Sequence, residues 1–191
     1  PELTLSFETD KLIYGKTNNP YDLNRTPGGS SGGAGAIIAS GGSPLDLGTD
    51  TGGSVRVPAG FCGIAGLKPT AGRVPRTGHI ISHSLGAIDS LTTVGPMARY
   101  IEDLVLVYPI ISGPDGEDPA IVPMPINDPA EVNLRHLRVA WFTDIGDVIS
   151  TTEVACTAKS AADTLTNVGV SLTEDIPKAI VRNQETSLLY A

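Results

Sequence analysis

Residues 28–33 read Gly-Gly-Ser-Ser-Gly-Gly, and residues 48–56 read Gly-Thr-Asp-Thr-Gly-Gly-Ser-Val-Arg. Of the 22 glycines in the chain, 15 fall between Gly28 and Gly78. A flexible linker is the simplest explanation for such enrichment, but apolar and charged residues interleave the glycines throughout. The stretch therefore predicts short helices and strands joined by turns that need positive φ.

Short elements are expected around these two glycine-serine clusters. We predict a helix over 31–39, a buried strand over 43–48 and a second short helix over 55–61. After the break at Gly95-Pro96, apolar residues recur at helical spacing from residue 101 to residue 108, which predicts a third helix.

The last third of the chain has a clearer pattern. Five prolines between residues 113 and 133 indicate an irregular connection. A strand is expected over 137–142, a helix that opens with a capping box at Ser150 and ends at Gly169, and a strand over 170–176. A final helix is expected over 178–191. Residues 137–176 thus predict a β-α-β unit, and with it an α/β fold whose mixed, mostly parallel β-sheet is covered by helices on both sides.

Composition narrows the classes of function. The formal net charge of -8 argues against a nucleic-acid partner, because such domains usually carry a basic patch. No apolar run approaches the roughly 20 residues of a membrane span. The two cysteines, Cys62 and Cys156, have neither disulfide-framework nor metal-site spacing. They fit free thiols in a reducing compartment, so a cytoplasmic location is expected.

The second glycine-serine cluster has features that a nucleophilic serine needs. Such a serine requires a base, exposure on a tight turn, and donors aimed at the developing oxyanion. Consecutive N–H groups in the two-glycine turn before Ser54 can converge on one oxygen. A helix that begins just after Ser54 adds its dipole to the same place. These features alone indicate a candidate and no more.

Several further motifs occur in a fixed order around the two clusters. They are Asn19-Pro-Tyr-Asp-Leu-Asn-Arg-Thr-Pro before the first cluster, then Pro58, Phe61-Cys-Gly63, Gly66-Leu-Lys-Pro-Thr70 and Gly95-Pro-Met-Ala-Arg99. Together they resemble the amidase signature family, most strongly over residues 14–99. The resemblance implies that residues 1–191 are the central part of a single amidase-signature domain. In it, 14–99 hold the core motifs, 113–133 the irregular connection and 137–176 the β-α-β unit.

The resemblance implies a Ser-Ser-Lys catalytic triad. By position, Ser54 is the nucleophile and Ser30 is the bridging serine, preceded by a cis Gly29–Ser30 peptide bond. Ser31 supports the same network.

The resemblance also assigns the turn before the nucleophile. Asp50 and Arg56 pair to hold this turn, although an ordinary buried ion pair is the alternative. The oxyanion hole is made by the backbone N–H groups of Thr51, Gly52, Gly53 and Ser54.

The implied reaction is amide hydrolysis of a small molecule through an acyl-Ser54 intermediate, without a metal or organic cofactor. Its base is a neutral lysine whose pKa burial lowers toward neutrality. That lysine lies upstream of the first serine cluster in the family, and Lys11, Lys16 and Lys68 are not at its position. Because the chain begins with proline, we expect a fragment that needs the remainder of the enzyme and is inactive alone.

Three hypotheses about other kinds of functional site have weaker support in the sequence. Residues 28–32 fit the G-x-S-x-G elbow of α/β-hydrolases, with His79, His83 or His136 as base, but the preceding segment 22–27 is polar and ends in proline. His79 and His83 have the spacing of metal ligands but lack an H-E-x-x-H motif, so ordinary polar histidines are favoured. A phosphate-binding loop lacks its G-x-x-x-x-G-K-[ST] pattern.

Alternatives also remain inside the family. One branch is the amidotransferase glutaminase subunit acting on misacylated tRNA, and in it glutamine usually follows the arginine where this chain has Val57. Segment 77–85 also looks less like that branch, so we favour a general amidase acting on small or hydrophobic amides. A catalytically inactive fragment or interaction module is the other alternative, against which the intact Ser30 and Ser54 argue. The sequence leaves the oligomeric state open, a homodimer included.

Overall fold

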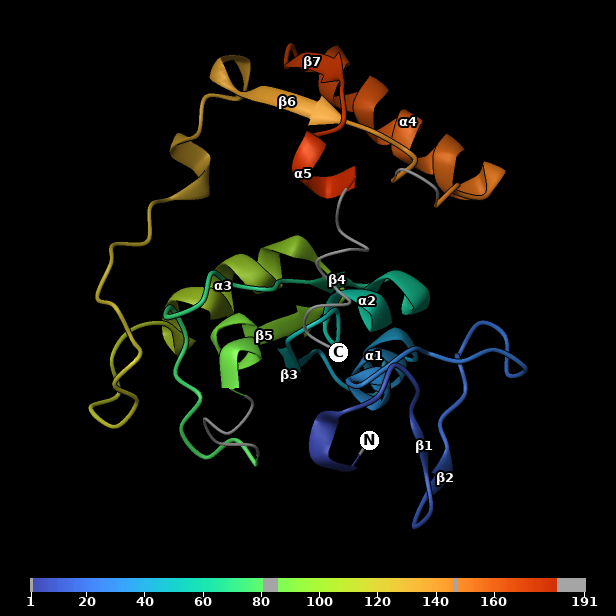
Figure 1. Cartoon of the computed structure of the whole chain (residues 1–191), viewed down its shortest axis with the longest axis vertical. Coiled ribbons are helices and arrows are strands. Elements are labelled where there is room, and N and C mark those ends of the chain that lie inside the picture. Colours follow the sequence, from blue (N-terminus) through green and yellow to red (C-terminus); the bar gives the residue numbers. More distant parts are fainter. Residues whose placement is uncertain (1, 81–85, 146–147, 182–191) are drawn as a thin grey trace. The chain divides into compact units, whose positions relative to one another are not determined.

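The computed structural model describes residues 2–80, 86–145 and 148–181. It forms two compact units, Pro1–Ile126 and Asn127–Ala191, which Figure 1 shows with their helices and strands labelled. The first unit carries both glycine-serine clusters and all the sequence motifs around them.

A three-stranded sheet lies at the centre of the first unit. Its order is β3-β5-β4, formed by Leu45–Asp50, Thr93–Ala98 and Ala65–Gly66, and both pairings are antiparallel. Gly48 lies opposite Gly95 in the register. A Cβ atom at Gly95 would lie 1.9 Å from the Leu67 carbonyl oxygen, so only glycine lets this backbone approach so closely.

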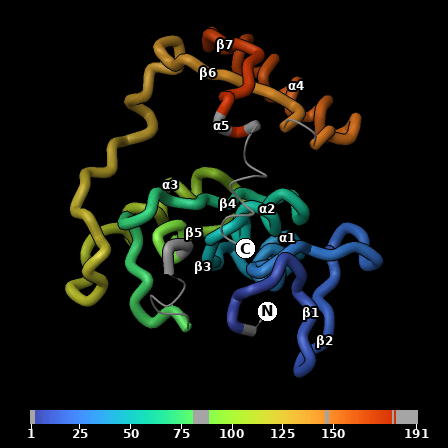
Figure 2. The backbone as a smooth tube through the Cα atoms, in the orientation of Figure 1, coloured from blue at the N-terminus to red at the C-terminus, as the bar shows by residue number. Residues whose placement is uncertain are grey.

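Three helices pack against this sheet, and Figure 2 traces the chain through them. They are α1 (Gly32–Ala39), α2 (Arg56–Cys62) and α3 (Ile101–Ile111), within one to three residues of the predicted bounds. Helix α1 contacts β3, β5 and α2, while α3 contacts β5 and β4. The two helices that follow the serine clusters are therefore packed on each other.

A small apolar core joins these elements. Ile38 of α1, Met97 of β5 and Val55, which precedes α2, are fully buried together with Ala59. Close approach depends on small residues, since a Cβ atom at Gly35 would lie only 3.2 Å from the Cys62 sulfur. The core thus fixes Val55, the residue directly after the candidate nucleophile.

The N-terminal part of the first unit adds smaller elements. A 3-10 turn over Glu2–Thr4 precedes a short antiparallel hairpin of β1 (Asp10–Lys11) and β2 (Gly15–Lys16). A second 3-10 helix spans Gly86–Leu91. These elements were not predicted from the sequence.

The second unit contains a β-α-β arrangement. Strands β6 and β7 pair in parallel on either side of α4 in the chain. The capping position differs by one residue from the prediction, because Thr151 rather than Ser150 caps α4 and accepts a hydrogen bond from the Val154 N–H. Gly169, with φ +90°, follows the helix as expected. The bounds are η3 Pro129–Glu131, η4 Leu134–His136, β6 Arg138–Trp141, α4 Thr152–Asn167, β7 Ser171–Glu174 and α5 Lys178–Val181.

The structure confirms the α/β class of the fold but not the mostly parallel sheet covered on both sides. The chain is a mixed α/β protein, but among the named strands of the described residues only β6 and β7 pair in parallel. The prediction extended the β-α-β pattern of 137–176 to the whole chain. It missed the antiparallel sheet because β3 pairs with a strand distant in sequence, which local periodicity does not reveal. The part of the predicted helix beyond residue 181 lies outside the described residues.

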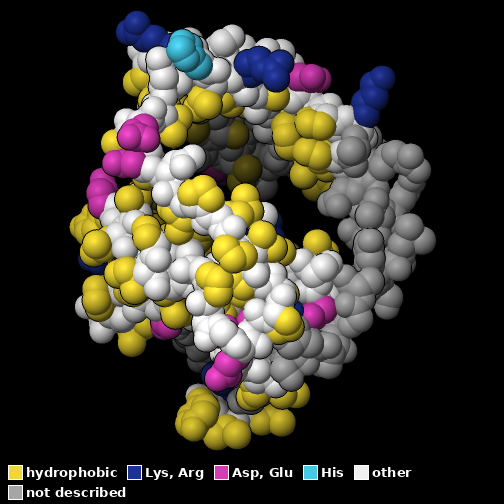
Figure 3. All heavy atoms as spheres, turned by 90° about the vertical axis from the view of Figure 1, so that its left-hand side faces the viewer, with side chains coloured by type: hydrophobic (Ala, Val, Ile, Leu, Met, Phe, Trp, Pro, Cys, Tyr) yellow, Lys and Arg dark blue, Asp and Glu magenta, His cyan; other side chains and the backbone are white. Residues whose placement is uncertain are grey.

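Hydrophobic side chains are frequent on the face that Figure 3 shows. In the first unit, Leu12, Ile13 and Tyr14 at the hairpin tip are exposed, and so are Leu106 and Ile110 of α3. Such extensive apolar exposure is typical of a surface that another part of a protein covers. Among the described residues, no helix has both the length and the apolar character that crossing a membrane requires.

Candidate active site

Ser30 lies on a tight loop directly before α1. Its side chain is buried, with 6% of the residue exposed, and the Gly29–Ser30 peptide bond is cis, as the resemblance implied. Gly28 has φ +77°, a conformation that favours glycine. Ser31 follows as the N-cap residue of α1, although its side chain makes no capping hydrogen bond.

Ser54 lies on the turn between β3 and α2. Gly53 in this turn has φ +134°, and a Cβ atom there would also lie 3.0 Å from a Val57 methyl group. Ser54 is partly buried, and Val55 behind it belongs to the core. The turn is therefore held between the end of a strand and a packed helix.

The fully buried carboxylate of Asp50 organises this turn. It accepts hydrogen bonds from the backbone N–H groups of Gly53 (2.8 Å), Val55 (3.1 Å) and Arg56 (3.2 Å). The Arg56 guanidinium adds two more, from Nε at 3.0 Å and Nη2 at 2.9 Å. The predicted ion pair between Asp50 and Arg56 is thus present, and it is bidentate.

The same contacts set the charge state of Asp50. Burial alone raises the pKa of this carboxyl, but hydrogen bonds from Arg56, Val55 and Gly53 outweigh it, so the pKa lies below its ordinary value of 3.8. The Asp50 contact raises the pKa of Arg56. Both groups therefore stay ionised at neutral pH.

These contacts change one part of the predicted oxyanion hole. The Gly53 N–H is directed to the Asp50 carboxylate, so it is not available to an oxyanion in this arrangement. The remaining candidates from the prediction are the N–H groups of Thr51, Gly52 and Ser54. The Thr51 hydroxyl is itself within 2.7 Å of the Thr92 hydroxyl, which fixes the start of the turn.

The two serine loops are bonded to each other. The Ser31 N–H donates to the Ser54 carbonyl oxygen at 3.1 Å. A Cβ atom at Gly48 would lie 2.6 Å from the Ser31 oxygen, so the glycine in β3 allows this approach. The structure therefore brings the two predicted serine clusters together. Within the described part of the chain, the Ser30 and Ser54 hydroxyl groups make no direct hydrogen bond to each other.

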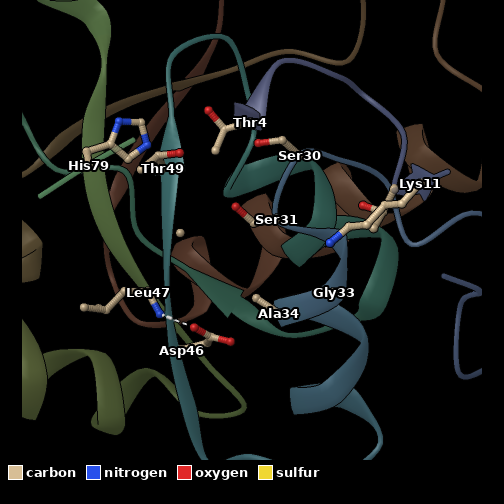
Figure 4. Close-up of a pocket in the computed structure, with 12 residues that line it drawn as sticks. Thr4, Lys11, Ser30, Ser31, Gly33, Ala34, Asp46, Leu47, Thr49 and His79 are labelled. Carbon is tan, nitrogen blue, oxygen red and sulfur yellow. Dashed lines mark hydrogen bonds between the residues drawn. The ribbon is translucent and has the colours of Figure 1, made fainter. Parts of the chain in front are cut away.

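A pocket of about 340 Å³ opens beside the first serine loop. The hydroxyl groups of Ser30 and Ser31 point into it, and Thr49, Asp46 and His79 lie around it (Figure 4). Ser54 is not among the described residues that line this pocket. The pocket is therefore next to Ser30, the candidate bridging serine, rather than around Ser54, the candidate nucleophile.

Sequence reasoning missed several residues of this site. Lys11 of β1 extends its amine into the pocket, and Thr9 lines it too. Lys68, which the sequence excluded as the triad lysine, lies close enough to Asp50 and Arg56 for their charges to act on it. Burial lowers the pKa of Lys68, the Asp50 charge opposes this and the Arg56 charge adds to it. Thr9 and Lys11 precede the quoted motifs, so no motif pointed to them, whereas Lys68 lies within Gly66-Leu-Lys-Pro-Thr70.

The three histidines of the alternative hypotheses lie in different parts of the chain. His79 lines the pocket, His136 lies in η4 of the second unit, and His83 is outside the described residues. No group of three or more His, Cys, Asp or Glu residues among the described residues could hold a metal ion. Because His83 lies outside the described residues, the hypothesis that His79 and His83 bind a metal stays untested.

Comparison with known proteins identifies the family. The family model described as Amidase matches residues 1–189. Fatty-acid amide hydrolase 1 from Sus scrofa is 42% identical over 144 residues, which are 74% of this chain and 25% of that protein. A glutamyl-tRNA(Gln) amidotransferase subunit from Sulfolobus acidocaldarius is 40% identical over 176 residues, 90% of this chain and 36% of that protein. The chain therefore belongs to the amidase signature family, as its motifs predicted.

Solved structures agree with this assignment. The structure of 6-aminohexanoate cyclic dimer hydrolase complexed with substrate superposes with a TM-score of 0.85 at 33% identity. It covers 95% of this chain, while the chain covers 38% of that protein. The chain thus spans between a quarter and two fifths of the length of these relatives.

Proposed function

We propose that the complete protein containing this chain hydrolyses amides, with the Ser54 hydroxyl as nucleophile and the Ser30 hydroxyl as its proton relay. The Ser54 oxygen attacks the amide carbonyl carbon while its proton passes to Ser30, and the Ser30 proton passes to a neutral lysine. The proton returns through Ser30 to the leaving nitrogen as the C–N bond breaks. Water then hydrolyses the acyl-Ser54 ester, which releases the carboxylate and restores the serine.

One contact carries this proposal most directly. The hydrogen bond from the Ser31 N–H to the Ser54 carbonyl ties together two loops that lie more than twenty residues apart in the chain. A proton relay needs its two hydroxyl groups close together, and rates fall steeply when such groups are displaced by about 1 Å. Joining the loops through their backbones supports a relay between the side chains they carry.

The anchored turn supports the oxyanion hole. We assign the donors to the N–H groups of Thr51, Gly52 and Ser54, and leave Gly53 to the Asp50 carboxylate. A preorganised donor is effective because it needs no reorientation when charge develops on the carbonyl oxygen. The role of Asp50 and Arg56 is to hold these amides in place.

The triad lysine is assigned to a part of the protein upstream of residue 1. This assignment follows the family resemblance, in which the lysine precedes the first serine cluster; the Lys11 amine also enters the pocket beside Ser30 and Ser31 but is not at that position. The exposed apolar side chains of the first unit fit cover by the remainder of the enzyme. In that complete protein we expect the strands to belong to one mixed sheet covered by helices on both sides.

For the substrate, we propose a small or hydrophobic carboxamide. Val57 after Arg56 distinguishes the chain from the usual pattern of the tRNA-amidotransferase branch, and fatty-acid amide hydrolase 1 is among its relatives. The 40% identity to a glutamyl-tRNA(Gln) amidotransferase subunit makes glutamine-dependent amidotransfer the second candidate. The free cysteines Cys62 and Cys156 fit a cytoplasmic location.

Product release distinguishes these functions, measured as ammonia from the primary amides and as the aromatic amine from the arylamide. The complete protein is assayed with hexanamide, with a hydrophobic arylamide and with free glutamine, and the chain of residues 1–191 is assayed beside it. We expect turnover of hexanamide or the arylamide to exceed that of glutamine by at least tenfold. Preference for glutamine would transfer the protein to the amidotransferase branch, and no turnover of any amide would end the proposal. Turnover by residues 1–191 alone would contradict the upstream lysine.

A further inference from the structure

Two threonine side chains hold the two peptide units on either side of the Gly28 Cα atom, directly before Ser30. The Thr9 hydroxyl donates to the Gly28 carbonyl oxygen at 2.8 Å. On the other side of the same residue, the Gly28 N–H donates to the Thr26 hydroxyl at 3.1 Å, and Thr26 donates onward to Glu8 at 2.5 Å. Side chains therefore satisfy both the N–H group and the carbonyl group of Gly28. Gly28 lies two residues before Ser30, so these bonds restrain the loop that carries Ser30.

The packing around these bonds is close. Thr9 is 2% exposed. A Cβ atom at Gly29 would lie 2.6 Å from the Glu8 nitrogen, and one at Gly32 would lie 2.3 Å from the Thr9 hydroxyl oxygen. The segment containing Glu8 and Thr9 therefore lies directly against the loop that carries Ser30, on both sides of that serine.

The Thr9 side chain is not required to attach its own segment. The Thr9 carbonyl oxygen already accepts a backbone hydrogen bond from the Thr17 N–H at 2.9 Å, which closes the hairpin independently of the side chain. The hydroxyl instead reaches a residue 19 positions away. Thr9 also lines the pocket that Ser30 faces. Its hydroxyl therefore restrains the backbone directly before Ser30, through the Gly28 carbonyl.

We propose that Thr9, assisted by Thr26, is a positioning residue for Ser30. Thr9 acts through the Gly28 carbonyl and contributes no group to the reaction. Without its hydroxyl, a buried carbonyl loses its donor, the Gly28–Gly29 peptide unit is free to rotate, and the Ser30 oxygen moves away from the proton path. The inference rests on the proposed function, because it assigns a role in the relay between Ser54 and Ser30.

A double-mutant cycle in the complete protein tests this role. Thr9→Val removes the hydroxyl and nearly preserves the side-chain shape, and Thr9→Ser retains the hydroxyl. Each is made with Ser30 intact and again with Ser30→Ala. The readouts are the second-order rate of Ser54 acylation by a fluorophosphonate, kcat and KM for the best amide, and the urea midpoint of unfolding.

With Ser30 present, we expect Thr9→Val to slow acylation at least tenfold, within the range that small misplacements of reacting groups produce. KM should stay near that of the parent, and Thr9→Ser should fall within about twofold of it. In the Ser30→Ala background, Thr9→Val should change the acylation rate less than about twofold, because the group it positions is already gone.

Asn19→Ala is the matched control. Asn19 is a buried polar residue of the same N-terminal segment, and its side chain donates to the Phe61 carbonyl at 2.7 Å rather than to the serine loop. It should lower the urea midpoint while folded enzyme acylates at the parental rate. An equal loss from Thr9→Val with and without Ser30 would overturn the inference, and so would no loss at all.

Thr26→Val gives a second test if Thr9→Val does not fold. It removes the bond to the Gly28 N–H at a less buried position, and we expect a loss of about threefold that again requires Ser30. A loss independent of Ser30 would overturn the inference. A parent protein that is never labelled at Ser54 would overturn the proposed function itself, whereas a labelled parent with an insensitive cycle would overturn the positioning role alone.

Discussion

Replacing Asp50 by alanine is expected to be far more damaging than replacing its partner Arg56. The Asp50 carboxylate is fully buried and accepts five hydrogen bonds, three from backbone N–H groups and two from the guanidinium. Asp50→Ala leaves these donors without their acceptor. Breaking a buried pair in this way typically lowers the free energy of unfolding by about 3–5 kcal/mol.

Arg56→Ala should lower the free energy of unfolding less, because 53% of the arginine side chain is exposed and water can occupy much of the space that the side chain vacates. The Asp50 carboxylate would keep its three backbone donors, so a loss of about 1–2 kcal/mol is expected. Asp50→Asn should lie near Asp50→Ala, since its NH₂ group would face donors rather than acceptors.

Urea unfolding of the complete protein, followed by circular dichroism at several urea concentrations, measures the three variants against the parent. Fluorophosphonate labelling of the folded variants reports separately on the turn. We expect labelling to be lost in Asp50→Ala and only reduced in Arg56→Ala. An Arg56→Ala variant that is less stable than Asp50→Ala would refute the view that the buried carboxylate, rather than its exposed partner, organises the turn.

Three further predictions concern stability. Gly95→Ala should prevent folding or lower the free energy of unfolding by more than about 3 kcal/mol, because its Cβ would lie 1.9 Å from the Leu67 carbonyl oxygen. Gly60→Ala, whose Cβ would meet no atom outside its own helix within 4 Å, should stabilise α2 by about 0.5–1 kcal/mol. Equal thermal midpoints for the two variants would contradict both predictions. Thr151→Ala removes the N-cap of α4 and should lower the free energy of unfolding by about 1 kcal/mol. An unchanged thermal midpoint would contradict this prediction. Because the pKa of Asp50 is lowered by folding, its stabilisation should be complete above pH 4 and decline as pH falls through that lowered pKa; Asp50→Asn should lose this acid dependence, and a parental acid profile in the variant would count against the assignment.

Local features were predictable because each depends on nearby residues. The helices beginning at Gly32 and Arg56 follow glycine clusters, and α4 ends at Asn167, two residues before Gly169, whose φ is positive. The ion pair of Asp50 with Arg56, which the resemblance implied, is also present.

Non-local features were not predictable in the same way. The mostly parallel sheet expected from the sequence is not confirmed, since β3 pairs antiparallel with β5, a partner decided by packing and not by any pattern within 45–50. The close approach of Thr9 to Gly28 likewise joins residues that no motif connects. The Gly53 N–H, assigned to the oxyanion hole by position, instead bonds to Asp50 because that carboxylate is buried beneath the turn.

The most direct test of the central assignment is the site of covalent modification in the complete protein. After reaction with a fluorophosphonate, intact mass and peptide mapping give the number and position of adducts. We predict one adduct, on Ser54, that disappears in Ser54→Ala, persists in Ser31→Ala and forms more slowly in Ser30→Ala. An adduct that remains in Ser54→Ala at another serine would contradict the assignment of the nucleophile.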